Sequence, residues 1–474
     1  MKAGIWTTSI QVVGKSFGLF RSLVLARLLV PDDIGLFGIT AVVLSLITRF
    51  SNVGLKKAII QKAEEVDDYL DTAWTFNVLR ASLFLIGLWV AAPWIAAFFE
   101  EPAAEPLIPA LGLGLLLVAL GSPRLPLLPR ELEFRRRFLF MLTGVVSDLL
   151  ISIVAAIVLR NAWALMLGFV GSKAAQVVVS YILLPHRPVL KIEISKFREL
   201  AHYGRWVFFN QVLFFLQYRG DNLLVGKFFG AAGLGIYLMA YTMCEAAITQ
   251  VGNVTTDVSF PSFARAQNDL PWVRRAFLTN LEWMFDVAFP VALVLALCAT
   301  PLTAVLLGEH WAGVAVILPY LAIAACARTL IMVANALSNG LGRPDVTLRM
   351  NLVIVGITYA LYYPLVSVAG LRGVGVALVL GQVGVIPVYA GFARRVAGIP
   401  RLEMLGRLGP GFLLGTSMAA VILVGRTGGA LWTLVVTLTA AALVYVGVAF
   451  LLWRVRQVGP FMMLRRLRTA YGKA

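Results

Sequence analysis

Eight basic side chains lie inside long apolar segments of this 474-residue chain. A Lys or Arg within a membrane span is costly unless it faces a protein interior, a water-filled cavity or the membrane surface. Cations gathered in one cavity could bind a phosphate or pyrophosphate group. The eight residues are Lys15, Arg21, Arg27, Arg49, Arg80, Lys173, Arg219 and Arg328.

Helical spacing predicts which of these cations share a face. In the first segment, Gln11, Lys15 and Ser22 follow one stripe. Arg21 flanks this stripe, whereas Arg27 points to the other side. Lys15 lies about 15 Å into its segment, so its side chain cannot easily reach the membrane surface. Arg27 lies near a segment end, where a long side chain extends readily to the surface.

Other segments repeat this pattern of deep charge. Arg80 and Lys173 also lie about 15 Å into their segments, and Lys173 forms a polar stripe with Gln176. Arg49 lies near a segment end. Polar stripes on several helices predict a shared aqueous cavity, although hydrogen bonding between packed helices would produce similar stripes. The predicted substrate-binding residues are Lys15, Arg21, Arg49, Arg80, Lys173, Gln11 and Gln176.

Acidic side chains are distributed differently from the basic ones. The first six apolar segments contain one deep acid, Asp148, and the next six contain several. A cationic half suits an anionic substrate, and an acidic half suits a coupling proton or metal cation. The predicted residues for ion coupling or a second cavity are Asp221, Glu245, Asp286, Asn210, Gln217, Arg328 and Asp148.

The composition indicates which elements hold these groups. The chain is 60% hydrophobic and 14% charged, against about half and a quarter in soluble proteins. We therefore expect a polytopic membrane protein with no separate soluble domain and no cleaved signal peptide. Each of the three cysteines lies in an apolar stretch, so we expect small buried side chains.

Segments of about 20 apolar residues predict fourteen transmembrane helices. Basic residues concentrate in alternate loops and in the C-terminal tail, which by the positive-inside rule places both termini in the cytoplasm. The excess of 41 Lys and Arg over 24 Asp and Glu then faces anionic headgroups, which disfavours a nucleic-acid partner. The predicted spans are 5–29, 34–51, 70–99, 105–122, 138–159, 162–184, 204–229, 234–258, 272–299, 313–336, 346–367, 373–393, 406–425 and 430–453.

A repeat organises these spans. Residues 26–39 and 226–239 align at a constant offset, and six predicted spans separate the starts of the two copies. Both copies therefore run in the same direction through the membrane, as in secondary transporters with parallel repeats. The matched pairs include Arg27 with Lys227, Gly35 with Gly235 and Phe37 with Tyr237. The predicted organisation is an N-terminal six-helix lobe in 1–200, a C-terminal six-helix lobe in 201–400, and two additional helices with a basic tail in 401–474.

Sequence motifs for catalysis or nucleotide binding are missing. The chain has no phosphate-binding loop, zinc motif, nucleophile elbow or dinucleotide fingerprint, so we expect no cofactor and no metal site. Small residues four positions apart predict close helix packing instead. They occur as Gly14 with Gly18, as Gly411 with Gly415, and in the glycine-rich run 370–384.

Four stretches carry a family resemblance: ARLLVPDDIGLFGI at 26–39, FSNVGLKKAIIQ at 50–61, PRELEFRRRF at 129–138 and DNLLVGKFFGAAGLGIYLMAYTM at 221–243. The chain resembles the polysaccharide transporter branch of the multidrug/oligosaccharidyl-lipid/polysaccharide (MOP) exporter superfamily. Within that branch it is similar to Wzx-type flippases for lipopolysaccharide, O-antigen or exopolysaccharide. The resemblance covers about residues 1–400, and the last two spans match by topology only.

The resemblance implies a MATE-like fold of two six-helix bundles in a V shape. It implies that undecaprenyl-pyrophosphate-linked oligosaccharide moves from the inner to the outer leaflet of the bacterial cytoplasmic membrane by alternating access. A proton or sodium ion, membrane lipids, a polysaccharide polymerase and glycosyltransferases are the implied partners. Arginines in the first two helices would bind the pyrophosphate, which implicates Arg21 or Arg27, together with Arg49. The last two helices would hold the lipid tail.

Two other functions are compatible with a polytopic chain. A cation-coupled multidrug exporter has the same fold, but the excess of buried bases disfavours it because such drugs are mostly cationic. A membrane glycosyltransferase or polymer ligase would need catalytic groups on a sizeable extracellular loop, and no predicted loop provides them. We therefore expect a transporter and not an enzyme.

Overall fold

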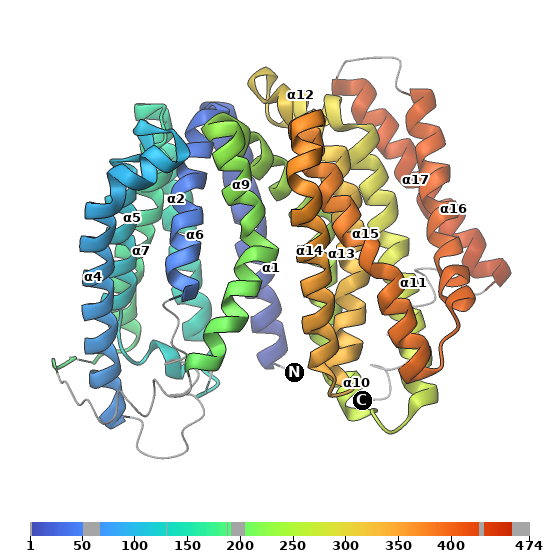
Figure 1. The fold of residues 1–474 in the computed structure, drawn as a ribbon, viewed down its shortest axis with the longest axis horizontal. Coiled ribbons are helices and arrows are strands. Elements are labelled where there is room, and N and C mark those ends of the chain that lie inside the picture. Colours follow the sequence, from blue (N-terminus) through green and yellow to red (C-terminus); the bar gives the residue numbers. More distant parts are fainter. Residues whose placement is uncertain are drawn as a thin grey trace. The chain divides into compact units, whose positions relative to one another are not determined.

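The computed structural model describes residues 2–50, 67–128, 130–186, 188–190, 204–425 and 431–456. This part of the chain is mostly α-helical and contains no β-strand. The chain divides into two compact units, Met1–Leu238 and Met239–Ala474 (Figure 1). The predicted all-helical polytopic fold is confirmed. The predicted lobes 1–200 and 201–400 were defined by the order of the membrane spans, which the two compact units do not test, so these boundaries stay a prediction.

Unit 1 is built around two antiparallel helix pairs. Helix α6 packs against α7 and α1, and α5 packs against α4 and α7. The 3-10 helix η1 (Pro102–Ala104) precedes α5, and the 3-10 helix η2 (Leu125–Leu127) follows it. The helices are α1 (Lys2–Leu28), α2 (Pro31–Phe50), α4 (Asp67–Phe99), α5 (Leu107–Leu120), α6 (Phe134–Leu159), α7 (Trp163–Leu183) and α9 (Gly204–Cys244), whose last residues enter unit 2.

Unit 2 is centred on α13, whose residues are mostly buried. Helices α10, α11 and α15 pack on α13, α14 packs on α15, and α16 lies between α11 and α17. The bounds are η3 (Glu245–Thr249, a π-helix), α10 (Gln250–Arg265), α11 (Leu270–Leu297), α12 (Ala299–Leu306), η4 (Glu309–Trp311), α13 (Ala312–Gly340), α14 (Pro344–Ala369), α15 (Leu371–Ala397), α16 (Arg401–Gly425) and α17 (Leu431–Arg456).

Twelve helical stretches among the described residues are long and apolar enough to cross a membrane. One of them, Arg219–Arg265, runs through two predicted spans on either side of Gly230, where the backbone leaves helical geometry. Helix α1 is outside this set, and its sequence contains the predicted polar stripe. The prediction of about fourteen membrane helices is therefore confirmed in outline. Large apolar side chains such as Trp89 and Trp94 are exposed on α4, where a bilayer would cover them.

The first copy of the repeat begins helix α2. Pro31 occupies the first helical position, where a missing N–H costs nothing. The Asp33 carboxylate accepts a hydrogen bond of 3.3 Å from the Val30 N–H, which is the backward half of a capping box. The Pro-Asp-Asp sequence is thus explained by helix initiation.

The second copy begins the part of α9 that follows Gly230, and this helix start is also capped by a carboxylate. Gly230 has a φ of 64°, and the next N–H, of Ala231, donates a 2.7 Å hydrogen bond to Glu101. The carboxylate that caps this helix start thus comes from a distant part of the chain, because Glu101 directly precedes η1. Nearby, Lys227 donates a 2.7 Å hydrogen bond to Glu100, which lowers the pKa of Glu100 below its ordinary value.

The two helix starts pack directly against each other inside unit 1. A Cβ atom on Gly35 would lie 1.7 Å from the carbonyl oxygen of Ala231, and one on Gly235 would lie 1.9 Å from that of Pro31. Pro31 and Ala231 are matched in the repeat, as are Gly35 and Gly235. The contact is therefore reciprocal, like an interface about a twofold axis.

The glycine predictions have mixed outcomes. Gly411 and Gly415 of α16 do contact α11, because Cβ atoms there would lie 2.5 and 2.6 Å from the Phe285 and Phe289 rings. The run 370–384 is also closely packed, with Gly373 against the backbone of α14. The prediction for Gly14 and Gly18 is wrong, since no described atom lies within 4 Å of a Cβ built at either position.

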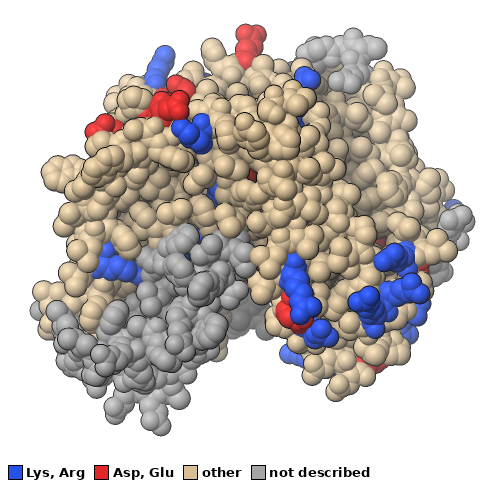
Figure 2. Space-filling model, in the orientation of Figure 1, with Lys and Arg blue, Asp and Glu red and all other residues tan. Residues whose placement is uncertain are grey.

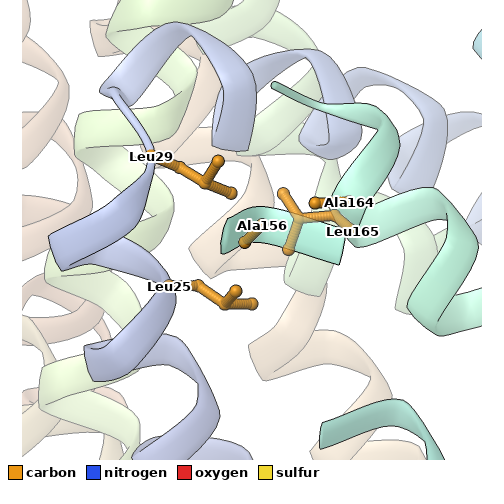
Figure 3. Close-up of a cluster of buried hydrophobic side chains, with 5 residues drawn as sticks. All are labelled: Leu25, Leu29, Ala156, Ala164 and Leu165. Atoms are coloured by element: carbon orange, nitrogen blue, oxygen red, sulfur yellow. The ribbon is translucent and has the colours of Figure 1, made fainter. Parts of the chain in front are cut away.

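A small apolar core holds the C-terminal end of α1 against the turn between α6 and α7 (Figure 3). Arg160 ends α6 in the left-handed conformation, and the Asn161 side chain accepts a 3.1 Å hydrogen bond from the Trp163 N–H at the start of α7. This turn fixes α7 beside α6, and therefore fixes the polar residues that both helices carry. The core residues are Leu25, Leu29, Ala156, Ala164 and Leu165.

Candidate functional site

Arg21 makes a polar contact between α1 and α6. Its Nη2 lies 3.1 Å from Oδ1 of Asp148, and its Nε donates a 3.0 Å hydrogen bond to Ser152 Oγ. Asp148 and Ser152 are one turn apart on α6, so they present one polar face to α1. Gly168 allows α7 to approach the same face, because a Cβ there would lie 2.6 Å from the Ser152 Cβ.

Lys173 lies at the middle of α7 and has polar partners within unit 1. Its Nζ donates a 3.1 Å hydrogen bond to Gln176, whose amide donates at 3.4 Å to the Phe140 carbonyl of α6. Gly144 makes room for this amide, since a Cβ there would lie 2.2 Å from it. The Lys173 ammonium also lies 5.7 Å from the centroid of the Phe169 ring, within cation–π range.

These groups leave an excess of positive charge at mid-helix. Arg21 forms an ion pair with Asp148, and Lys173 lines the same cavity as Asp148. Two cations therefore lie near one carboxylate. Charges removed from water need compensation, and an anionic group bound beside Lys173 would provide it.

A cavity of about 520 Å³ lies beside Lys173 and is formed by α5, η2, α6 and α7. Apolar side chains form most of its wall, and its polar lining residues are Arg137, Asp148, Ser172, Lys173 and Gln176. Ligand pockets of this size hold small molecules or parts of larger ones. The arrangement suits an amphiphile with an anionic head.

Lys173 is the only predicted cation among the described residues that line this cavity; Arg21 reaches it only through its ion pair with Asp148, which does line it. Lys15 is exposed within its unit, while Arg49 and Arg80 are half-buried on α2 and α4. The side chains of Gln11 and Asn210 lie outside what the structure describes. The predicted grouping of Lys15, Arg49 and Arg80 with Lys173 therefore stays a prediction.

Asp221 of α9 is held by two hydrogen bonds. It accepts one of 2.5 Å from the Tyr237 hydroxyl and one of 2.8 Å from the Asn222 N–H. Its side chain is buried, whereas that of Arg219, two residues earlier on the same helix, is exposed. Gln217 is half-buried on the same helix. Because Tyr237 follows the reciprocal helix start, Asp221 helps to fix that contact.

Two predicted residues of unit 2, Arg328 and Glu245, lie near the junction between α9 and η3. The Arg328 guanidinium of α13 donates a 2.6 Å hydrogen bond to the Tyr241 hydroxyl and also lies over its ring. Glu245 begins the π-helix η3 and is half-buried. Single π-turns inside helices are frequent at functional positions, so this segment remains a candidate for ion coupling.

Asp286 of α11 is fully buried, and neither of its carboxyl oxygens has a hydrogen-bond partner among the described residues. One turn earlier, Glu282 forms a 3.0 Å ion pair with Arg407 of α16. Gly411 follows Arg407 by one turn and lies against Asp286. Arg407 of α16 thus pairs with Glu282 of α11, whereas Asp286, one turn further along α11, faces the uncharged Gly411.

Three functional candidates were missed from the sequence. Arg137 directly precedes the predicted span 138–159 and Arg407 is the second residue of the predicted span 406–425, whereas α6 and α16 begin four and five residues before those spans, so that both arginines lie well inside helices. Ser152 was not singled out, although it accepts the Arg21 hydrogen bond. Continuing the helical periodicity upstream of the apolar runs would have identified the two arginines.

The fold is similar to those of solved membrane-protein structures. One is lipid II flippase MurJ in its inward closed conformation, with a TM-score of 0.74, 14% identity, and coverage of 95% of this chain and 99% of that chain. The fold is also similar to that of an inward-facing MATE family multidrug transporter of the MOP superfamily, with a TM-score of 0.58 and 16% identity over 84% of this chain and 98% of that chain. These similarities establish a MurJ/MATE-like fold.

Sequence comparison then gives the family. Residues 24–316 match the family described as polysaccharide biosynthesis protein, and the chain belongs to that family. It is 23% identical to the lipopolysaccharide biosynthesis protein WzxC of Escherichia coli K12, over 79% of this chain and 76% of that protein. It is 22% identical to the teichuronic acid biosynthesis protein TuaB of Bacillus subtilis 168, over 62% of this chain and 61% of that protein.

Proposed function

We propose that this protein flips an undecaprenyl-pyrophosphate-linked oligosaccharide across the bacterial cytoplasmic membrane. The observation that carries the proposal is the cationic site in unit 1, where Lys173 and Arg21 share Asp148 beside an amphipathic cavity. A pyrophosphate supplies the missing negative charge, and an apolar wall suits the start of an isoprenoid chain. Membership of the polysaccharide biosynthesis family supports the same substrate class.

The transport cycle follows from the repeat. Two lobes would alternate between inward and outward access, with both termini in the cytoplasm and the sugar delivered to the outer leaflet. Synthesis of the sugar on one side and its polymerisation on the other require glycosyltransferases and a polymerase as neighbours. A cationic multidrug substrate is disfavoured, because the deep site of unit 1 already has excess positive charge.

Replacing Lys173 with glutamine should reduce flipping about tenfold or more, because a hydrogen bond to a charged group contributes about 1.5–3 kcal/mol. Purified protein in proteoliposomes would be given the lipid-linked sugar, and a membrane-impermeant sugar-modifying enzyme would report the leaflet. Lys173→Arg should retain most activity. Lys227→Gln is the matched control, because it removes a charge paired with Glu100 outside the cavity. Flipping by Lys173→Gln at the wild-type rate would contradict the proposal.

Ion coupling is proposed at Asp286. An unpaired carboxyl buried away from water is stable in its protonated form, and the rings of the adjacent Phe285, of Phe289 and of Phe412 pack against one another between α11 and α16. Protonation and release would change the charge between α11 and α16. The neighbouring Glu282–Arg407 pair gives the released carboxylate a cation only one turn away.

Asp286→Asn should therefore abolish the acceleration of flipping by a proton gradient while leaving the melting temperature close to wild type. The amide keeps the size of the carboxyl but cannot release a proton. Asp345→Asn, at an exposed ion pair of α14, should keep the full gradient response. A gradient response that survives Asp286→Asn would assign coupling elsewhere, while a wild-type protein without any flipping would count against the flippase proposal itself.

A further inference from the structure

A second basic site lies in unit 2, far along the chain from Lys173. A cavity of about 530 Å³ is formed where α14 begins, α15 ends and α16 begins. Figure 2 shows Lys and Arg side chains gathered at this end of the unit. The charged residues in the described part of its lining are all arginines: Arg343, Arg349, Arg395 and Arg401.

Helix stability does not explain these arginines. Arg343 precedes α14, Arg349 follows in its second turn, and Arg401 is the first residue of α16. Positive charge near a helix N-terminus is unfavourable, because that end already carries partial positive charge. Arg395 alone is in a helix's last turn, where a cation is favourable.

The negative charge next to the cavity is too small to balance the arginines. Asp345 pairs with Arg343 at 3.1 Å and contacts Arg349 at 3.8 Å. The nearby Glu403 of α16 is engaged by Arg274 of α11. Two helix N-termini and an unbalanced arginine cluster form an anion-binding arrangement.

The rest of the cavity is apolar and continues onto a surface suited to lipid. Val346 and Met350 form buried parts of its wall, and Val388 lines it while remaining 43% exposed. Beyond the cavity, α14 exposes Leu352 and α15 exposes Val383. An acyl chain lying on this face would reach the cavity without crossing water.

We infer that this cavity binds the headgroup of an anionic phospholipid of the inner leaflet. The phosphodiester would contact Arg395 and Arg401, and the acyl chains would lie along α14 and α15. Basic pockets between membrane helices on the cytoplasmic side bind anionic headgroups, and the charge pattern predicts that this end is cytoplasmic. The site is separate from the one proposed for the transported lipid.

The test compares phosphatidylglycerol with phosphatidylethanolamine of the same acyl chains, using native mass spectrometry and melting curves of the full-length protein in detergent. Phosphatidylglycerol should bind more tightly and raise the melting temperature more. Arg395→Gln should weaken it about fivefold and Arg395→Gln/Arg401→Gln about 25-fold, from the ~1 kcal/mol that each arginine contributes near an anionic surface.

Arg394→Gln is the matched control, because Arg394 is exposed in the same helix turn but does not line the cavity. It should leave phosphatidylglycerol binding unchanged, and Asp345→Asn should strengthen it. Equal binding of the two lipids, or an equal loss in Arg394→Gln, would overturn the inference. So would displacement of the lipid by millimolar inorganic phosphate, which would assign the site to a soluble anion.

Discussion

Replacing Gly35 with alanine should lower the free energy of unfolding by about 3 kcal/mol, the upper part of the usual range for overpacking. The added Cβ would lie 1.7 Å from the Ala231 carbonyl oxygen, which belongs to the backbone and cannot rotate away. Gly235→Ala should have a similar effect, because the same contact is made in reverse with Pro31. Thermal unfolding of the detergent-purified variants, followed by circular dichroism, measures both.

Two other glycines provide the controls. Gly406→Ala on α16 should be neutral or slightly stabilising, since no atom lies within 4 Å of its added Cβ and alanine favours helix. Gly38→Ala should be destabilising but rescued by Leu238→Ala, because there the clash is with a side chain. If Gly35→Ala melted like Gly406→Ala, the two helix starts would not be in contact.

The repeat shows what a sequence can and cannot determine. Matching Gly35 with Gly235 requires only the chain itself, and so does the expectation of a helix start at each copy. That the copies touch one another, glycine to backbone, depends on the packing of α2 against α9. The offset alone is equally compatible with two distant copies. The Glu101 cap on Ala231 is likewise tertiary, because its donor and acceptor are 130 residues apart.

In the candidate site, too, contacts within one helix could be predicted from the sequence, whereas contacts between helices could not. Lys173 and Gln176 are one helical turn apart, so their contact could be predicted from spacing. The pairing of Arg21 with Asp148 needed the approach of α1 to α6, and sequence spacing only showed that both were deep. Gly14 and Gly18 failed as a packing prediction, whereas Gly411 and Gly415 succeeded, because small residues permit a close contact without supplying a partner.

Arg21→Met should destabilise the protein by about 3 kcal/mol, the usual cost of leaving one member of a buried ion pair without the other. Asp148 would then retain only Lys173 as a nearby cation, and Ser152 would lose its Arg21 donor.

Asp148→Asn should raise the affinity for a pyrophosphate-linked lipid, because it removes the carboxylate that neutralises Arg21 and Lys173. Flipping should be slower than in the wild type, because the more tightly bound lipid is released more slowly.

The double variant Arg21→Met/Asp148→Leu separates a structural role from a binding role. Replacing both members of a buried pair with apolar groups is often neutral for stability, so the melting temperature should return close to wild type. Flipping should stay low, because the Arg21 guanidinium proposed to contact the pyrophosphate is gone, although the net charge of the site is unchanged. If the double variant recovered stability and flipping together, the pair would be a packing contact between α1 and α6, and the anion would have to be bound by Lys173 without Arg21.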